Sequence, residues 1–166
     1  MRKFLLSLCT VLAVSACLTQ NPQGGRIEVG DKIPSFEVTL EDGSSFSSSS
    51  LIGTPSLIIF FHTTCPDCRR TLPEVQKAYD VYGSRVRFVA ISREQALPGV
   101  RAWWDANGID IPFSAQTDKR VYNLFAESRI PRVYLSDKNG IVRACYDDNP
   151  CPDYTLLADE LEKLLQ

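Results

Sequence analysis

Two stretches of the chain are apolar almost without interruption, a pattern typical of strands that are covered on both faces. They occupy residues 56–61 and 86–91. Between them, apolar side chains or thiols recur every three or four positions from residue 65 to residue 82. This spacing predicts a helix with one buried face. Buried strands separated by a helix indicate a sheet that is covered by helices.

Shorter elements are predicted on both sides of this unit. Hairpins are expected at 36–46 and 132–146, because Asp42-Gly43 and Asn139-Gly140 suit tight turns. Helices are expected at 99–107, at 119–126 and from Tyr154 onward, with a short extended piece at 111–115 and a surface loop of serines at 47–50. The order predicts an α/β fold, with a mixed central sheet between helical layers.

Length and charge narrow the range of functions. The chain has 166 residues, enough for one domain with a sizeable core, and a formal net charge of −2. Its basic residues are scattered and form no patch. A nucleic-acid-binding role is therefore not expected.

The N-terminal residues have the features of an export signal. Arg2 and Lys3 precede an apolar stretch at 4–14, which is too short to span a bilayer comfortably. We expect residues 1–16 to be a signal peptide, residues 17–27 a polar flexible tether, and residues 28–166 the folded domain.

The cysteines divide into pairs once the signal is removed. Cys9 lies in the signal and Cys17 begins the tether, so Cys65, Cys68, Cys145 and Cys151 remain in the domain. Disulfides persist in exported proteins, so two close pairs indicate two sites that can form a disulfide.

The run Cys65-Pro66-Asp67-Cys68 carries the clearest chemical signal. It follows a predicted buried strand and opens the helix, where unpaired N–H groups and the helix dipole favour a thiolate. Cys65 is expected to attack or be attacked, and Cys68 to resolve the mixed disulfide. An inert stabilising disulfide is a weaker interpretation, since so short a loop constrains the unfolded chain very little.

These residues, with Pro73 and the later run 129–134, resemble the thioredoxin fold, most closely the extracytoplasmic TlpA/ResA branch, over residues 28–166. The resemblance implies a thiol-disulfide oxidoreductase without a bound cofactor, more often a reductase than an oxidase. It also implies a cis proline at Pro131 that faces the dithiol, with the backbone of Ile130 pairing with a bound peptide.

The lipid-anchored form of this branch is implied by the run 14–17, which resembles the bacterial lipobox. In that motif the cysteine, here Cys17, is acylated with chains such as palmitate and becomes the mature N-terminus. The alternative is an ordinary secretory signal. The implied partners are protein dithiols or disulfides and a membrane or periplasmic electron donor, at the periplasmic side of a membrane or at the cell surface.

Several positions depart from the patterns of this fold. Thr64 stands where a tryptophan commonly contacts substrate, Ile59 stands where cytosolic thioredoxins carry a buried aspartate, and Thr71 replaces the glutamate of ResA-type proteins. The usual proton acceptors for the second thiol are thus absent from their places. His62 and Asp67 are the remaining nearby candidates, although a histidine in the place of His62 more often only satisfies the end of the strand.

Cys145 and Cys151 allow two interpretations. They could form a structural disulfide that fixes the loop between the last strand and the last helix. They could also be a second redox pair, because the last strand of the hairpin should run back toward the dithiol edge of the sheet.

Two other functions must be distinguished. A thiol peroxidase would have a threonine at the position of His62, three residues before Cys65. A copper-handling protein of the Sco kind would separate its cysteines by three residues and add a late histidine, whereas this chain has neither. The spacing of Cys145 and Cys151 is also poor for a zinc ribbon, so no metal is predicted.

Overall fold

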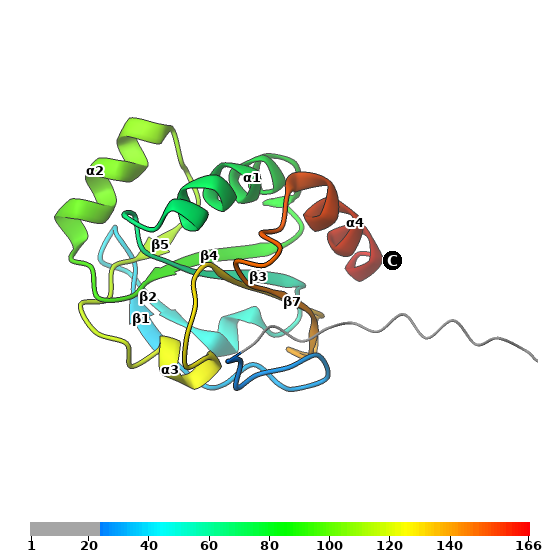
Figure 1. Ribbon diagram of the computed structural model, residues 1–166. Helices are drawn as coiled ribbons and strands as arrows, with labels where there is room; N and C mark the ends of the chain where they lie inside the picture. Colours follow the sequence, from blue (N-terminus) through cyan, green and yellow to red (C-terminus); the bar gives the residue numbers. More distant parts are fainter. Residues whose placement is uncertain (1–23) are drawn as a thin grey trace, which may run out of the picture.

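A five-stranded mixed sheet forms the centre of the molecule, in the order β5-β4-β3-β6-β7 (Figure 1). The structure is a computed structural model that describes residues 24–166. The strands are β3 (Ser56–Phe61), β4 (Arg87–Ser92), β5 (Phe113–Ser114), β6 (Arg132–Ser136) and β7 (Val142–Tyr146).

The central strand β3 is buried along its whole length, as its apolar run predicts. It pairs in parallel with β4 and antiparallel with β6. β7 is antiparallel to β6, so its end lies at the same edge of the sheet as the end of β3. This edge carries the dithiol.

Three helices lie on one face of the sheet: α1 (Pro66–Tyr82), α2 (Leu97–Asn107) and α4 (Tyr154–Leu164) (Figure 1). Alternate residues of β3, such as Leu57 and Ile59, pack in one core cluster with apolar side chains of these helices. The dithiol helix α1 therefore rests on the same hydrophobic layer as the C-terminal helix.

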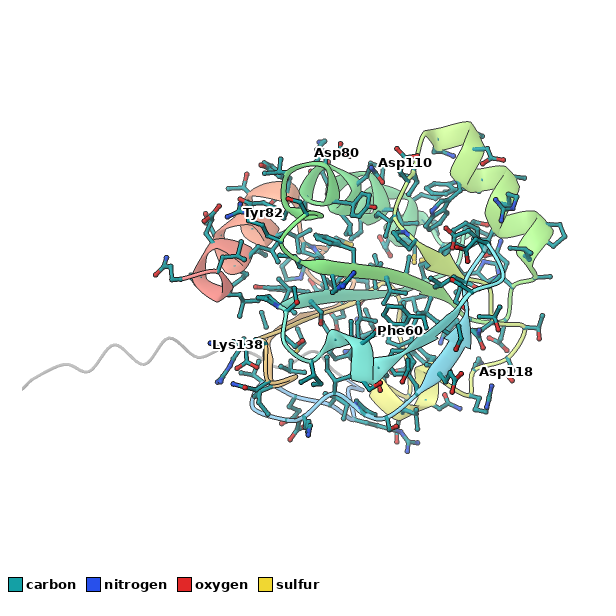
Figure 2. The ribbon with its side chains drawn as sticks, turned by 180° about the vertical axis from the view of Figure 1, so that it is seen from behind. Phe60, Asp80, Tyr82, Asp110, Asp118 and Lys138 are labelled. Carbon is teal, nitrogen blue, oxygen red and sulfur yellow. The ribbon has the colours of Figure 1, made fainter. Side chains whose placement is uncertain are left out.

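The opposite face carries β1 (Glu37–Thr39), β2 (Ser45–Ser47), the short 3-10 helix η1 (Ser48–Leu51) and α3 (Tyr122–Phe125). Phe60 points to this side of the sheet (Figure 2) and contacts the rings of Tyr122, Phe125 and Tyr134. These residues belong to a second core cluster, so each face of the sheet has its own hydrophobic layer. The predicted α/β class, with an N-terminal hairpin and an inserted helix and strand, is confirmed.

Two local predictions were wrong. The serines expected in a loop form η1, because the Ser47 hydroxyl accepts a hydrogen bond from the backbone of Ser49 and caps the helix. The helix expected at 119–126 is regular only over α3, and the residues before it form a turn in which Asp118 accepts from the backbone N–H of Arg120.

Part of the segment expected to be a tether lies on the domain. Gly25 forms an isolated β-bridge with Ala126, and the backbone N–H groups of Arg26 and Ile27 donate to the Phe125 carbonyl. The predicted signal peptide at 1–16 and the predicted lipidation site Cys17 lie outside the described residues. No helix between residues 24 and 166 is both long and apolar enough to cross a membrane.

Candidate dithiol site

Cys65 occupies the N-cap of α1, directly after the turn that follows β3. Its backbone is extended, and its sulfur accepts a hydrogen bond from the backbone N–H of Cys68, with Sγ and N 3.5 Å apart. Pro66 fills the first helical turn, where no hydrogen-bond partner is lost. The local sequence thus places one thiol at the positive end of the helix dipole, where negative charge on sulfur is stabilised.

The two thiols differ in their access to solvent. Cys65 is partly exposed, whereas Cys68 is fully buried on the inner face of α1. Burial strongly raises the pKa of the Cys68 thiol, because the apolar layer disfavours its charged form. Both residues are thiols in this structure. The arrangement gives an outer sulfur that partners can reach and an inner sulfur shielded from them.

A second segment faces the outer sulfur. The peptide bond between Ile130 and Pro131 is cis, as the resemblance implied. The Cys65 thiol donates to the Ile130 carbonyl, with Sγ and oxygen 3.5 Å apart. Residues 65 positions apart in the sequence therefore form one site at the edge of the sheet.

The predicted neighbours of the dithiol are engaged in contacts of their own. The ring nitrogen Nδ1 of His62 lies 3.2 Å from the backbone nitrogen of Thr64 and 2.9 Å from its hydroxyl. Since the backbone N–H donates, Nδ1 acts as an acceptor in this contact. The Asp67 carboxylate pairs with Arg70. A part for His62 or Asp67 in proton handling stays a prediction.

Gln95 is a site residue that the sequence did not reveal. Its side-chain carbonyl accepts from the backbone N–H of Thr63 at 2.9 Å, and its side-chain N–H donates to the Thr63 hydroxyl. This double contact fixes the turn that leads into Cys65. No spacing or motif along the chain relates residues 63 and 95, so the sequence pattern does not indicate the pair.

Cys145 lies on the opposite face of the sheet from the dithiol. It is buried in the second core cluster, while Cys65 and Cys68 belong to the first. Burial raises the pKa of Cys145 to about 11. Cys151 is partly exposed, and its thiol donates to the Asp148 carbonyl with Sγ and oxygen 3.6 Å apart. Both residues are thiols here, so a disulfide between them stays a prediction.

The loop between these two cysteines does reach the dithiol edge. Its residue Asp148 pairs with Arg129, directly before Ile130, with nitrogen and oxygen 2.7 Å apart. The buried carboxylate of Asp147 lies 4.0 Å from the guanidinium of Arg132, directly after Pro131. Within the described part of the chain, no group of three or more His, Cys, Asp or Glu side chains is placed to hold a metal ion.

Known proteins similar in sequence include several that are named thiol-disulfide oxidoreductases. The thioredoxin-like protein YneN of Bacillus subtilis is 27% identical over 121 residues, which is 70% of each chain. The thiol-disulfide oxidoreductase ResA of Geobacillus kaustophilus is 25% identical over 118 residues, or 70% of this chain and 68% of ResA.

Solved structures agree on the fold. A thiol:disulfide interchange protein of the thioredoxin family from Chlorobium tepidum superimposes with a TM-score of 0.73 at 25% identity, covering 82% of this chain and 97% of that one. The thioredoxin domain of a thiol-disulfide oxidoreductase from Bacteroides vulgatus superimposes with a TM-score of 0.71 at 18% identity, covering 84% of this chain and 99% of that one. The profile of the AhpC/TSA family matches residues 29–145, and the chain therefore belongs to this thioredoxin-like family.

Proposed function

We propose that this protein exchanges disulfides with exported protein partners through Cys65 and Cys68. The observation that carries the proposal is the asymmetry of the pair. A partly exposed sulfur caps the helix, and a buried thiol lies one helical turn behind it. The relatives named thiol-disulfide oxidoreductases support the same activity.

The exchange has two steps. The Cys65 thiolate attacks one sulfur of a partner disulfide, the other partner sulfur leaves as a thiolate, and a mixed disulfide forms. Cys68, once deprotonated, then attacks the Cys65 sulfur and releases the remaining partner thiol. Two electrons pass to the partner, and the Cys65–Cys68 disulfide is left behind. Run backwards, the same steps oxidise a partner dithiol.

We expect a substrate groove beside Cys65, in which the partner's backbone lies along Ile130 and Pro131 and next to Thr64. The exposure of Thr64 and the contact between the Cys65 thiol and the Ile130 carbonyl support this role. The direction of electron flow, toward reduction of partners, rests on the resemblance to the TlpA/ResA branch.

We place the protein outside the cytoplasm, held on a bacterial membrane by lipid at Cys17. Support comes from the signal-like residues 1–16 and the lipobox-like run that ends at Cys17. A membrane or periplasmic electron donor would return the dithiol to its reduced form.

Trapping tests the proposed chemistry. A Cys68→Ser variant should accumulate mixed disulfides with partner proteins, because the resolving thiol is gone, and reductant should release them. The Cys65→Ser variant is the control and should capture none. Capture that persists through Cys68 in this control would show that the roles of the two sulfurs are assigned wrongly.

A peroxide assay separates the alternative activity. The position expected to hold a threonine in a thiol peroxidase is His62, whose ring is tied to Thr64. We expect the reduced protein to consume hydrogen peroxide no faster than its Cys65→Ser variant. Rapid consumption that depends on Cys65 would favour the peroxidase function instead.

A further inference from the structure

We propose that the ion pair between Arg129 and Asp148 is a positioning device for the substrate groove, holding the Ile130 backbone in place for an extended peptide. The inference rests on the proposed disulfide exchange and goes beyond it. It assigns a role to the loop between Cys145 and Cys151, which the exchange chemistry alone does not use.

The backbone at Arg129 needs to be held. Arg129 has a φ of 68°, in the left-handed region that side-chain-bearing residues rarely adopt. A residue in this conformation costs free energy and persists only where its surroundings fix it. It directly precedes Ile130, so any relaxation at Arg129 turns the Ile130 carbonyl away from Cys65.

Two contacts hold Arg129, one through its side chain and one through its backbone. The Arg129 guanidinium pairs with the Asp148 carboxylate, with nitrogen and oxygen 2.7 Å apart. The Tyr122 hydroxyl donates to the Arg129 carbonyl at 2.7 Å. The side chain of Arg129 is thereby held by the loop after β7, and its backbone is held by helix α3.

Both contacts are suited to a rigid support. The side chains of Arg129 and Asp148 are 35% and 26% exposed, so their pair is partly shielded from solvent. The Asp148 carboxylate raises the pKa of Arg129 above its ordinary value through their hydrogen bond. Burial raises the pKa of Tyr122, so its hydroxyl keeps the proton that it donates.

The contacts of Arg129 bear on the Cys65 sulfur through the neighbouring residue Ile130. The Ile130 carbonyl accepts from the Cys65 thiol at 3.5 Å, so its orientation is set relative to Cys65. A peptide that pairs with this backbone presents its sulfur to Cys65 only when Ile130 is fixed. A misplacement at this point lowers the rate of attack without altering the sulfur itself.

The test compares a peptide with a small reagent in the Cys68→Ser background. The peptide probe is an extended heptapeptide whose single cysteine is joined to thionitrobenzoate; the small probe is N-acetylcysteine with the same group. In both cases the Cys65 thiolate attacks the probe's cysteine sulfur, a new disulfide forms and coloured thionitrobenzoate leaves. The ratio of the two rates measures the contribution of the groove.

Arg129→Gln should lower the peptide rate about fivefold, the effect expected of one partly exposed ion pair, and leave the small-probe rate unchanged. Asp148→Asn should do the same, and the double variant should be no worse than either single one, since one pair is lost in all three. Arg129→Lys should retain most of the peptide rate.

Arg143→Gln is the matched control. It breaks another Arg–Asp pair, between Arg143 and Asp137 at 2.6 Å, beside the turn at the far end of the β6–β7 hairpin. Its rate ratio should equal that of the Cys68→Ser parent. Because Gln and Arg both carry a Cβ, Arg129→Gln adds no backbone strain of its own.

Other outcomes would overturn the inference. A peptide preference that is unchanged in Arg129→Gln and Asp148→Asn would show that the pair does not position the groove. An equal loss for both probes would place the effect on Cys65 itself or on the fold. If the parent reacts with neither probe, the proposed function fails as well, which is a distinct result. Should Arg129→Gln not fold, Asp148→Asn removes the same pair and leaves the Tyr122 contact in place.

Discussion

At the scale of single residues, the burial of Cys68 behind Cys65 has a direct chemical consequence. A buried thiol with a raised pKa stays protonated and out of reach, while the sulfur at the helix tip is accessible. In the folded, reduced protein, iodoacetamide should modify Cys65 at least ~10-fold faster than Cys68. Mass spectrometry of the digested protein measures both rates.

Unfolding supplies the control for this prediction. In urea the environments of the two thiols become alike, so their rates should converge. Equal rates in the folded protein would mean that Cys68 is not shielded as the structure has it.

The sequence pointed to the candidate dithiol but not to the residues that support it. Cys65 and Cys68 are adjacent on one helical turn, so a local motif reveals them. The contacts of Arg129 with Asp148 and of Thr63 with Gln95 join residues 19 and 32 positions apart. Such pairs depend on how strands and loops meet in space, which spacing along the chain does not encode.

At the scale of elements, the β6–β7 hairpin depends on a left-handed residue in its turn. Gly140 has a φ of 75°, and a Cβ at this position would come within 2.7 Å of Ile52 Cδ1. Gly140→Ala should therefore lower the free energy of unfolding by about 1–2 kcal/mol. Urea denaturation of the reduced protein measures the change.

Gly99 in α2 provides a comparison with the opposite expected sign. It lies within the helix, and a Cβ there would meet only the Gln95 side chain, at 3.4 Å or more. Gly99→Ala should raise stability by about 0.5–1 kcal/mol by restricting the unfolded chain. Equal effects of the two substitutions would contradict the left-handed turn.

Elements with a strong pattern were predicted well, whereas the short 3-10 helix and the docked N-terminal residues were not. The strand at 56–61 has the bounds the pattern indicated, and the last helix begins at Tyr154 as expected. η1 and the docked residues 24–27 are held by side-chain caps and by hydrogen bonds to α3. These contacts exist only in the folded molecule, so hydrophobic periodicity carries no trace of them.

At the scale of the whole molecule, the buried thiol of Cys145 should make stability depend on alkaline pH. Its folded pKa is about 11 and its ordinary value is 9.0. Between these two values the folded protein keeps the thiol proton, whereas the unfolded chain has lost it. The contribution of the protonated thiol to the free energy of unfolding is therefore complete below pH 9 and is lost as the pH rises toward 11. We expect a loss of roughly 1 kcal/mol per pH unit in this window.

Cys145→Ala isolates this contribution, since other groups also titrate at high pH. Urea denaturation of both proteins under reducing conditions, at several pH values in the window, should give a shallower slope for the variant. Identical slopes would contradict the burial of Cys145.

The sheet also bears on the two interpretations of Cys145 and Cys151. Cys145 and the dithiol lie in core layers on opposite faces, which favours a structural role. Replacing both Cys145 and Cys151 by Ser should leave partner turnover and redox potential unchanged, while lowering stability under oxidising conditions by about 2 kcal/mol. A changed potential would instead support exchange between the two pairs.

The place where the chain enters the domain has a geometric consequence for any anchored form. The Gly24 carbonyl accepts a hydrogen bond from the backbone N–H of Glu127, and a Cβ on Gly24 would collide with the Ser128 hydroxyl. Ser128 itself lies two positions before Ile130. The point where the chain enters the domain therefore lies close to the edge of the sheet that carries Cys65. If a membrane surface holds the residues before Gly24, it must leave space beside Cys65 for a partner protein. The number of residues between that surface and Gly24 would then limit the size of the partner that can bind.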